Sequence, residues 1–519
     1  MHHAMIRPLL LLLAVTSLLP AASGADGGLT PDILDSLRQS YKRDDVRFNA
    51  LAANPIDTLV LNRGVLDAHD THFSHRIRFK GVTDQHQSGR CWLFAGLNTL
   101  RPAIIAKNNL DGFEFSESYL QFWDKLEKSN LYLEIMIEMR DTDPLDREWE
   151  AVHKWTLDDG GWWQFVAALV SKYGVVPKEA MPTTATSENT NTLNKILERK
   201  LHVDAAKMHE MHRAGSDVNA LRAYKKQAMV DVYRILAQTL GEPPQEFTWR
   251  APKKKKDDDK KEEPKKEDDR KSVAAKNDAK KQGAKAEEDK KDGEKQDGDK
   301  TASKAEKPAL DIDLTPAKKY TPQSFYREVV GASLEDYVSL YSDPLNPKMK
   351  HYAFKRTRNL ADKADVDFVN IEIDAMKKIA MESVMANEPV WFASDVGKDQ
   401  STKLGIMAVN LFNYGPLFNV DLHLDRAQRI RYRDGGSNHA MVFMGVDVVD
   451  NKPAKWLVEN SWGTEKGDKG TWTLYNDWFD EHVYMVIVNK KHVPAEMLKV
   501  LEEPVTMLPP WYPGAGGAE

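Results

Sequence analysis

The sequence predicts an α+β protein in which a helical lobe, followed by a large helical insertion, precedes an antiparallel β lobe. Apolar residues recur at helical spacing from about residue 92 to residue 250. Beyond about residue 388, short runs with strand-like alternation replace them. With 519 residues, 41% of them hydrophobic, the chain is long enough to bury a large core.

Residues 1–25 have the pattern of a secretory signal peptide. Arg7 supplies a positive charge, Leu9 to Leu19 is apolar, and Ser23-Gly24-Ala25 is a small-residue cleavage site. The apolar run is shorter than the roughly 20 residues that a membrane span needs. We therefore expect export to a periplasm or to the outside of the cell, with no membrane span; an uncleaved N-terminal anchor is the alternative.

The only cysteine of the chain, Cys91, lies in the segment 26–112, at the head of an apolar run. A helix is expected from Trp92 to about Arg101, where Pro102 should limit or kink it. This segment is the N-terminal part of the predicted helical lobe.

The helical insertion is expected over residues 113–250. Its aromatic residues recur at helical spacing, which is more typical of a core than of a cofactor site. Glycine and proline end its helices. The expected helices are 113–140, 162–172 and 216–240.

Residues 251–308 form a charged stretch with 20 Lys or Arg and 17 Asp or Glu. It has no aromatic residue, so it cannot bury enough apolar surface to offset the entropy of ordering, and we expect disorder. The charges of both signs are mixed and the whole chain has a net charge of −6, which argues against nucleic acid as an obligatory partner.

After the charged stretch, residues 309–387 are expected to complete the helical insertion, and residues 388–519 to form the β lobe with a C-terminal arm. The β lobe is predicted from β-branched and aromatic runs. The expected strands are 389–392, 439–448, 456–460, 471–474 and 484–488.

Cys91 is a candidate nucleophile, because a helix N-terminus and a nearby imidazolium can lower a thiol pKa to roughly 3.5–7.5. His439 is the preferred partner, since it follows a turn and opens a predicted strand. Asn460, at the end of another strand, is suited to orient the imidazole. Gln85 is positioned to donate an amide hydrogen to an oxyanion beside the Cys91 N–H.

Spacing alone does not force this pairing. Three other histidines are available, namely His153, His423 and His482. Another group, His69, His72 and His75, repeats at a spacing of three, but no cysteine or carboxylate cluster completes a zinc site around it. We therefore expect neither a metal ion nor a cofactor.

The segment from Gln85 to Phe94, with Gln-x5-Cys-Trp, resembles the active-site segment of papain-like cysteine peptidases. Ser88-Gly89-Arg90-Cys91-Trp92-Leu93-Phe94 is similar to the bleomycin hydrolase (aminopeptidase C) branch of that family. The resemblance covers nearly everything from about residue 30 onward, except the charged stretch. Other matching segments are 113–119, 122–130, 159–161, 172–178, 390–392, 395–398, 438–441 and 458–463.

The resemblance implies a papain-like two-lobe fold with Cys91 as nucleophile, His439 as acid and base, Asn460 as orienting amide and Gln85 as oxyanion donor. It also implies a homohexamer that acts on peptides, with active sites facing an inner channel. The function expected is that of an exported cysteine aminopeptidase with bleomycin hydrolase-like amide hydrolysis.

Two features depart from the family: the signal-like N-terminus and the end of the chain. In the family the C-terminal arm lies in the cleft, and its carboxylate holds the substrate's α-amine. Residues 508–513 resemble that arm, whereas 514–519 differ. An open cleft would make the protein an endopeptidase; a non-catalytic peptide-binding or nucleic-acid-binding barrel is the third alternative.

Overall fold

The computed structural model describes residues 27–154, 156–254 and 313–515. The signal peptide predicted over 1–25 lies outside these residues, and so does most of the stretch 251–308 for which disorder was predicted. Residues 251–254 are described, and Pro252 and Lys253 form isolated β-bridges with Leu314 and Leu110, so the prediction of disorder was wrong for these four residues. The described chain divides into two compact units. Unit 1 ends at Leu61 and includes Phe412–Phe418, and unit 2 contains the rest.

Unit 1 consists of short helices joined by one β-bridge. Its helices are α1 (Pro31–Ser40), α2 (Asp45–Ala53), α3 (Ile56–Val60) and α14 (Tyr414–Phe418). Thr30 and Asp44 accept backbone hydrogen bonds at the starts of α1 and α2, as N-cap residues do. The Tyr414 hydroxyl donates to Asp57 at 2.7 Å and joins the two parts of the unit.

The helices of unit 2 include most of those expected from the sequence. They are α4 (Arg63–Asp67), α5 (Cys91–Lys107), α6 (Glu117–Glu138), α7 (Arg147–Lys154), α8 (Trp163–Tyr173), α9 (Ala185–Glu188), α10 (Asn191–Arg213), α11 (Val218–Leu240), α12 (Pro322–Phe325), α13 (Ile373–Met385), α15 (Arg426–Tyr432), α16 (Asn476–His482) and α17 (Ala495–Lys499). The predicted helices at 113–140, 162–172 and 216–240 are confirmed as α6, α8 and α11. None of the described helices combines the length and the apolar character that a bilayer span requires.

Helix α5 is longer than expected, because it continues through Pro102 to Lys107. Proline removes one helical hydrogen bond. The apolar residues on both sides of it, Leu100 and Ile104 among them, are buried. Their burial outweighs the missing bond, so the expectation that the helix ends near Arg101 was wrong.

The strands form one large sheet and one short pair. They are β1 (His75–Arg76), β2 (Phe247–Trp249), β3 (Lys318–Tyr320), β4 (Tyr337–Tyr341), β5 (Lys350–Phe354), β6 (Asp367–Asn370), β7 (Val390–Ser394), β8 (Gln400–Ser401), β9 (Ile406–Met407), β10 (His439–Val449), β11 (Lys452–Glu459), β12 (Thr471–Tyr475), β13 (Val483–Asn489) and β14 (Thr506–Leu508). The order in the large sheet is β14-β5-β6-β4-β13-β7-β10-β11-β12-β9-β8, with β1 on β10, while β2 pairs with β3. All five strands predicted beyond residue 388 are confirmed.

Two expectations about this sheet need correction. The sheet is mixed, because β4–β6, β5–β14 and β9–β12 are parallel pairs within an otherwise antiparallel arrangement. The region 309–387 is not helical throughout, since it contains β3 to β6 before α13. Short apolar runs do not distinguish a buried strand from a helix, and pairing direction depends on partners remote in the sequence.

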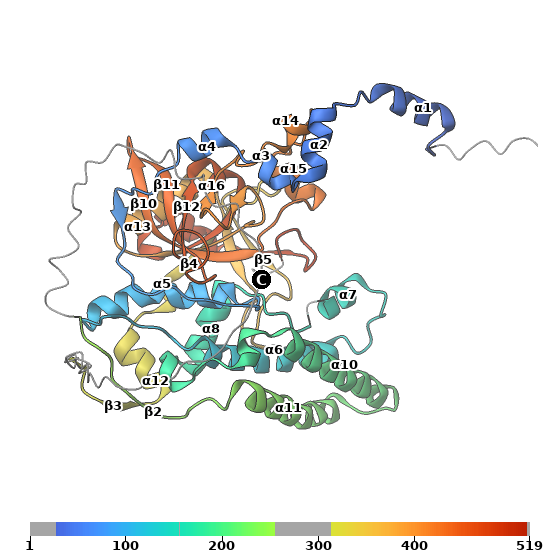
Figure 1. Ribbon diagram of the computed structural model, residues 1–519. Helices are drawn as coiled ribbons and strands as arrows, with labels where there is room; N and C mark the ends of the chain where they lie inside the picture. The colour runs from blue at the N-terminus through green and yellow to red at the C-terminus, as the bar shows by residue number, and fades with distance from the viewer. Residues whose placement is uncertain (1–26, 155, 255–312, 516–519) are drawn as a thin grey trace, which may run out of the picture. The chain divides into compact units, whose positions relative to one another are not determined.

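Helix α5 lies between helices α6 and α8 and the sheet of unit 2. It packs against α6 and α8 on one side and against β7 and β10 on the other. Figure 1 shows α6, α8, α10 and α11 together on the helical side, and β10, β11 and β12 across α5 from them. The N-terminus of α5 therefore lies beside the central strands, where side chains from both parts of the fold can meet.

Candidate active site

Cys91 is the first residue of α5 and is fully buried. The backbone N–H of Ala440 donates to its Sγ at 3.4 Å. Because Ala440 directly follows His439 in β10, this contact brings the predicted nucleophile to the start of the strand that carries the predicted base. A thiolate at this position also gains from the partial positive charge of the helix N-terminus.

His439 is held by Asn460. Its Nε2 lies 2.8 Å from Asn460 Oδ1, and both side chains are buried. An amide oxygen only accepts hydrogen bonds, so Nε2 carries the hydrogen. In the neutral ring Nδ1 is then the nitrogen that can accept a proton.

The surroundings of Asn460 hold this pair in place. The Ser461 N–H donates to Asn460 Oδ1 at 2.8 Å. The ring of Trp462 lies 4.7 Å from the His439 ring, tilted by 34°, and meets Trp472 edge-on. The indole shields the His439–Asn460 hydrogen bond from water, which strengthens it.

Gln85 connects the loop before Cys91 to the loop after Asn460. Its Nε2 donates to the Ser88 carbonyl at 2.6 Å, and its Oε1 accepts from the Ser461 hydroxyl at 2.6 Å. A primary amide carries two hydrogens, so one remains for an oxyanion. The structure thus brings together the four predicted residues.

The other histidines considered from the sequence lie elsewhere. The His153 ring lies 4.5 Å from the Trp149 ring on α7, tilted by 32°, His423 is exposed, and His482 lies 3.6 Å from Asp399. Among the described residues, no group of histidine, cysteine and carboxylate side chains has the arrangement of a metal site.

Replacing Asn460 with alanine is expected to lower kcat by roughly 100-fold, because the His439 ring loses its orienting acceptor and its tautomer is no longer set. The unfolding temperature of the variant serves as the control for folding. Steady-state kinetics on a peptide substrate measures the effect, and an unchanged kcat would show that Asn460 does not orient the base.

The loop at Asp159–Gly161 lies beside the start of α5. The Trp92 indole donates to the Asp159 carbonyl at 2.6 Å. A Cβ at Gly161 would lie 2.5 Å from a Trp92 ring atom, so only glycine fits.

Asp159, in the same loop, is a buried carboxylate. Burial alone would raise its pKa, but the effect of the Lys125 ammonium, 2.7 Å away, is larger and lowers that pKa. The carboxylate is therefore charged and holds the loop.

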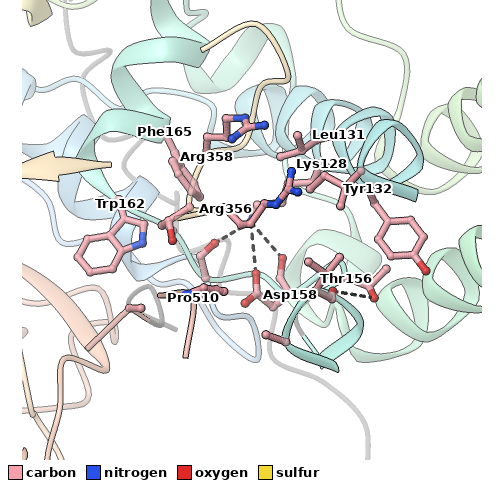
Figure 2. Close-up of a pocket in the computed structure, with 17 residues that line it drawn as sticks. Lys128, Leu131, Tyr132, Thr156, Asp158, Trp162, Phe165, Arg356, Arg358 and Pro510 are labelled. Carbon is pink, nitrogen blue, oxygen red and sulfur yellow. Dashed lines mark hydrogen bonds and ion pairs between the residues drawn. The ribbon is translucent and has the colours of Figure 1, made fainter. Parts of the chain in front are cut away.

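A cavity of about 110 Å³ borders this loop. Gly160 and Gly161 line it together with apolar side chains of α6 and α7, and Pro510 and Ala515 of the C-terminal arm complete it. Figure 2 shows Lys128 reaching toward Asp158 within this pocket, with Pro510 at its edge. The arm thus ends, as far as it is described, against the loop next to the nucleophile helix.

A buried ion pair that the sequence did not indicate lies behind the site. Arg101 of α5 pairs with Glu459, the residue before Asn460, and both are about 1% exposed. Burial raises the pKa of Glu459 to about 7. The pair joins α5 to the end of β11. The feature of the sequence that could have indicated this ion pair is Arg101 itself, a lone arginine within an apolar helical run.

Residues 28–274 and 310–515 match the model of the peptidase C1-like family. The chain belongs to this family. Its papain-like fold combines helices with a sheet, and the protein is a cysteine-type peptidase.

Known relatives resemble the chain over nearly its whole length. Aminopeptidase C of Streptococcus thermophilus is 32% identical over 497 residues, covering 93% of this chain and 98% of that protein. Bleomycin hydrolase of Gallus gallus is 32% identical over 476 residues, covering 89% and 92%. The crystal structure of PepW from Lactobacillus rhamnosis HN001 superposes with a TM-score of 0.81 at 32% identity, covering 95% of this chain and all of that one.

Proposed function

We propose that the protein is a cysteine aminopeptidase that removes N-terminal residues from peptides. The observation that carries this proposal is the meeting of Cys91, at the N-terminus of α5, with the His439–Asn460 pair at the start of β10. Relatives of similar length are named aminopeptidase C and bleomycin hydrolase, which favours peptides as substrates together with bleomycin hydrolase-like amide hydrolysis.

The reaction follows from the positions of these groups. The Cys91 thiolate attacks the scissile carbonyl carbon, and the oxyanion accepts hydrogen bonds from Gln85 and from the Cys91 N–H. His439 then protonates the leaving amine as the C–N bond breaks, which leaves a thioester on Cys91. A water molecule, deprotonated by His439, attacks the thioester; the acid leaves and the thiol is restored.

The position of the C-terminal arm supports cleavage from the N-terminus rather than within a chain. Ala515 lines the cavity that borders Gly160 and Gly161, so the described part of the arm lies against the loop next to α5, which supports an arm that restricts access to Cys91 from that side. The remaining residues, 516–519, lie outside the described part of the chain. An endopeptidase needs that side of the cleft to be open.

Kinetics on matched peptides with free and acetylated N-termini tests the aminopeptidase assignment. We expect cleavage of the free peptides only; efficient cleavage of acetylated ones would favour an endopeptidase. Labelling of Cys91 by a thiol-directed epoxide, lost in Cys91→Ala, distinguishes either peptidase from a non-catalytic binding barrel.

Truncation after Pro513 is expected to raise the cleavage of acetylated peptides by about tenfold, which corresponds to about 1.4 kcal/mol of lost obstruction. The full-length chain and the same peptides with free N-termini are the controls. The same rate before and after truncation would mean that the arm does not restrict the cleft.

The two-lobe arrangement with a large helical insertion, the homohexamer with inward-facing sites and export after removal of residues 1–25 belong to the same proposal. They rest on the sequence patterns and on the family resemblance. The N-terminal sequence of the secreted protein and its mass by light scattering test export and assembly. An unprocessed intracellular chain or a monomer would contradict them.

A further inference from the structure

Arg90 directly precedes Cys91 and is the N-cap residue of α5, yet only 2% of it is exposed. Its guanidinium donates to three separate segments. Nε donates to the Ser88 hydroxyl at 2.9 Å, Nη1 to the Gln121 amide oxygen at 2.9 Å, and Nη2 to the Ser187 carbonyl. The side chain of the residue next to the nucleophile is therefore held at three points.

All three acceptors of Arg90 are neutral. Among the described residues, no carboxylate lies within 4.0 Å of its guanidinium. Buried charges are normally paired, because desolvation makes an unpaired one costly. A cation at a helix N-terminus is also unfavourable for the helix itself. The fold thus keeps a charge at this position at a cost in stability.

The carboxylates that face Arg90 are engaged elsewhere or buried. Asp159 pairs with Lys125, and Glu188 lies 3.7 Å from His86. Glu117, on α6, is the carboxyl group with the largest electrostatic effect on Arg90. None of the three neutralises the guanidinium by direct contact.

Glu117 is 1% exposed, and among the described residues its Oε2 has no hydrogen-bond partner. Lys178 and Glu114 also face it. Burial raises the pKa of Glu117 to about 7, so this carboxyl group is protonated in acid solution. Burial lowers the pKa of Arg90 to about 10, which still leaves it charged at neutral pH.

We propose that Arg90 is a positioning residue whose buried charge stabilises the thiolate of Cys91 from behind the helix N-terminus. This proposal rests on the role of Cys91 in the proposed function. His439 approaches Cys91 from β10, whereas the Arg90 guanidinium contacts α6, on the other side of α5. Charges interact strongly across a site that excludes water.

The test follows the ionisation of Cys91 in the full chain. Because the chain has one cysteine, the ultraviolet absorbance of the thiolate and the rate of alkylation by iodoacetamide both report Cys91 alone. In Arg90→Met the midpoint of both titrations should rise by about one pH unit. The alkylation rate below the midpoint should fall about tenfold.

Three further variants separate the effect of the Arg90 charge from the effect of its packing. Gln121→Leu removes a neutral hydrogen bond to Arg90 and should leave the midpoint of the Cys91 titration unchanged. Arg90→Lys keeps a positive charge, so its midpoint should lie close to the wild-type value. In Glu117→Gln the midpoint should also stay unchanged, because Glu117 is already protonated in acid solution. An equal shift in Gln121→Leu and Arg90→Met would overturn the proposal.

If Arg90→Met does not fold alone, Arg90→Met/Glu117→Gln is compared with Glu117→Gln, because the double variant removes the buried guanidinium together with the buried carboxyl group nearest to it in electrostatic effect. The same midpoint with and without Arg90 would show that Arg90 only anchors the loop. That result would leave the proposed function intact, because peptide cleavage by the wild-type protein is measured separately.

Discussion

Replacing Cys91 with alanine is expected to lower kcat on peptide substrates by at least about 10⁴-fold. The reaction proposed here has no route without the thioester, and the chain has no second cysteine to take its place. The remaining groups, Gln85 and the helix N-terminus, bind the substrate and its oxyanion but form no covalent bond. Single-turnover and steady-state kinetics on a free N-terminal peptide measure the loss.

Combined variants make this prediction sharper. Residues that act as one unit are not additive, so Cys91→Ala/His439→Ala should be no slower than Cys91→Ala. Unchanged thermal unfolding in Cys91→Ala, which removes one buried sulfur atom, shows that the fold is intact. Turnover within about 100-fold of the wild type would exclude Cys91 as the nucleophile.

Replacing Arg101 with methionine is expected to lower the free energy of unfolding by about 3–5 kcal/mol, because it leaves the Glu459 carboxylate buried without a partner. Glu459 precedes Asn460, so the loss affects the connection between α5 and β11 as well as overall stability. Urea unfolding followed by tryptophan fluorescence measures the change.

The effect of Arg101→Met should depend on pH. Burial raises the pKa of Glu459 to about 7 in the folded protein, above its value of 4.5 in an unfolded chain. The stability that this carboxyl group contributes is therefore greatest below about pH 4.5 and is lost as the pH rises through about 7. Without Arg101 the loss on ionisation is larger, so the deficit of the variant should grow as the pH rises through about 7 and above.

A second substitution provides the matched control. In Arg101→Met/Glu459→Gln no charge remains at this position, so much of the lost stability should return and the added pH dependence should disappear. A deficit in Arg101→Met that is independent of pH would show that packing, rather than the unpaired carboxylate, determines the stability.

Local patterns predicted the elements with strong periodicity. The helices α6, α8 and α11 and the strands beyond residue 388 were found because apolar residues recur at intervals that match one buried face. The strands β4 to β6 were missed, since short buried runs have no distinct period. The passage of α5 through Pro102 was missed because it depends on packing against both neighbours.

By itself, the sequence determined which residue types were available for catalysis. It has a single cysteine before an apolar helix, a histidine after a turn, and an Asn-Ser-Trp segment after a strand. These features are local, because capping, turns and periodicity depend on near neighbours along the chain. The same local features also indicated where the candidate histidine and asparagine lie relative to their strands.

Only the tertiary structure decided which of these residues meet. The contact from Ala440 to Cys91 spans 349 positions, and those from Arg101 to Glu459 and from Arg90 to Gln121 likewise join remote segments. The sheet order that sets β10 between β7 and β11 brings His439 to Asn460. Burial of charged groups depends on every element around them, so the states of Arg90, Glu117 and Glu459 have no local sequence signal.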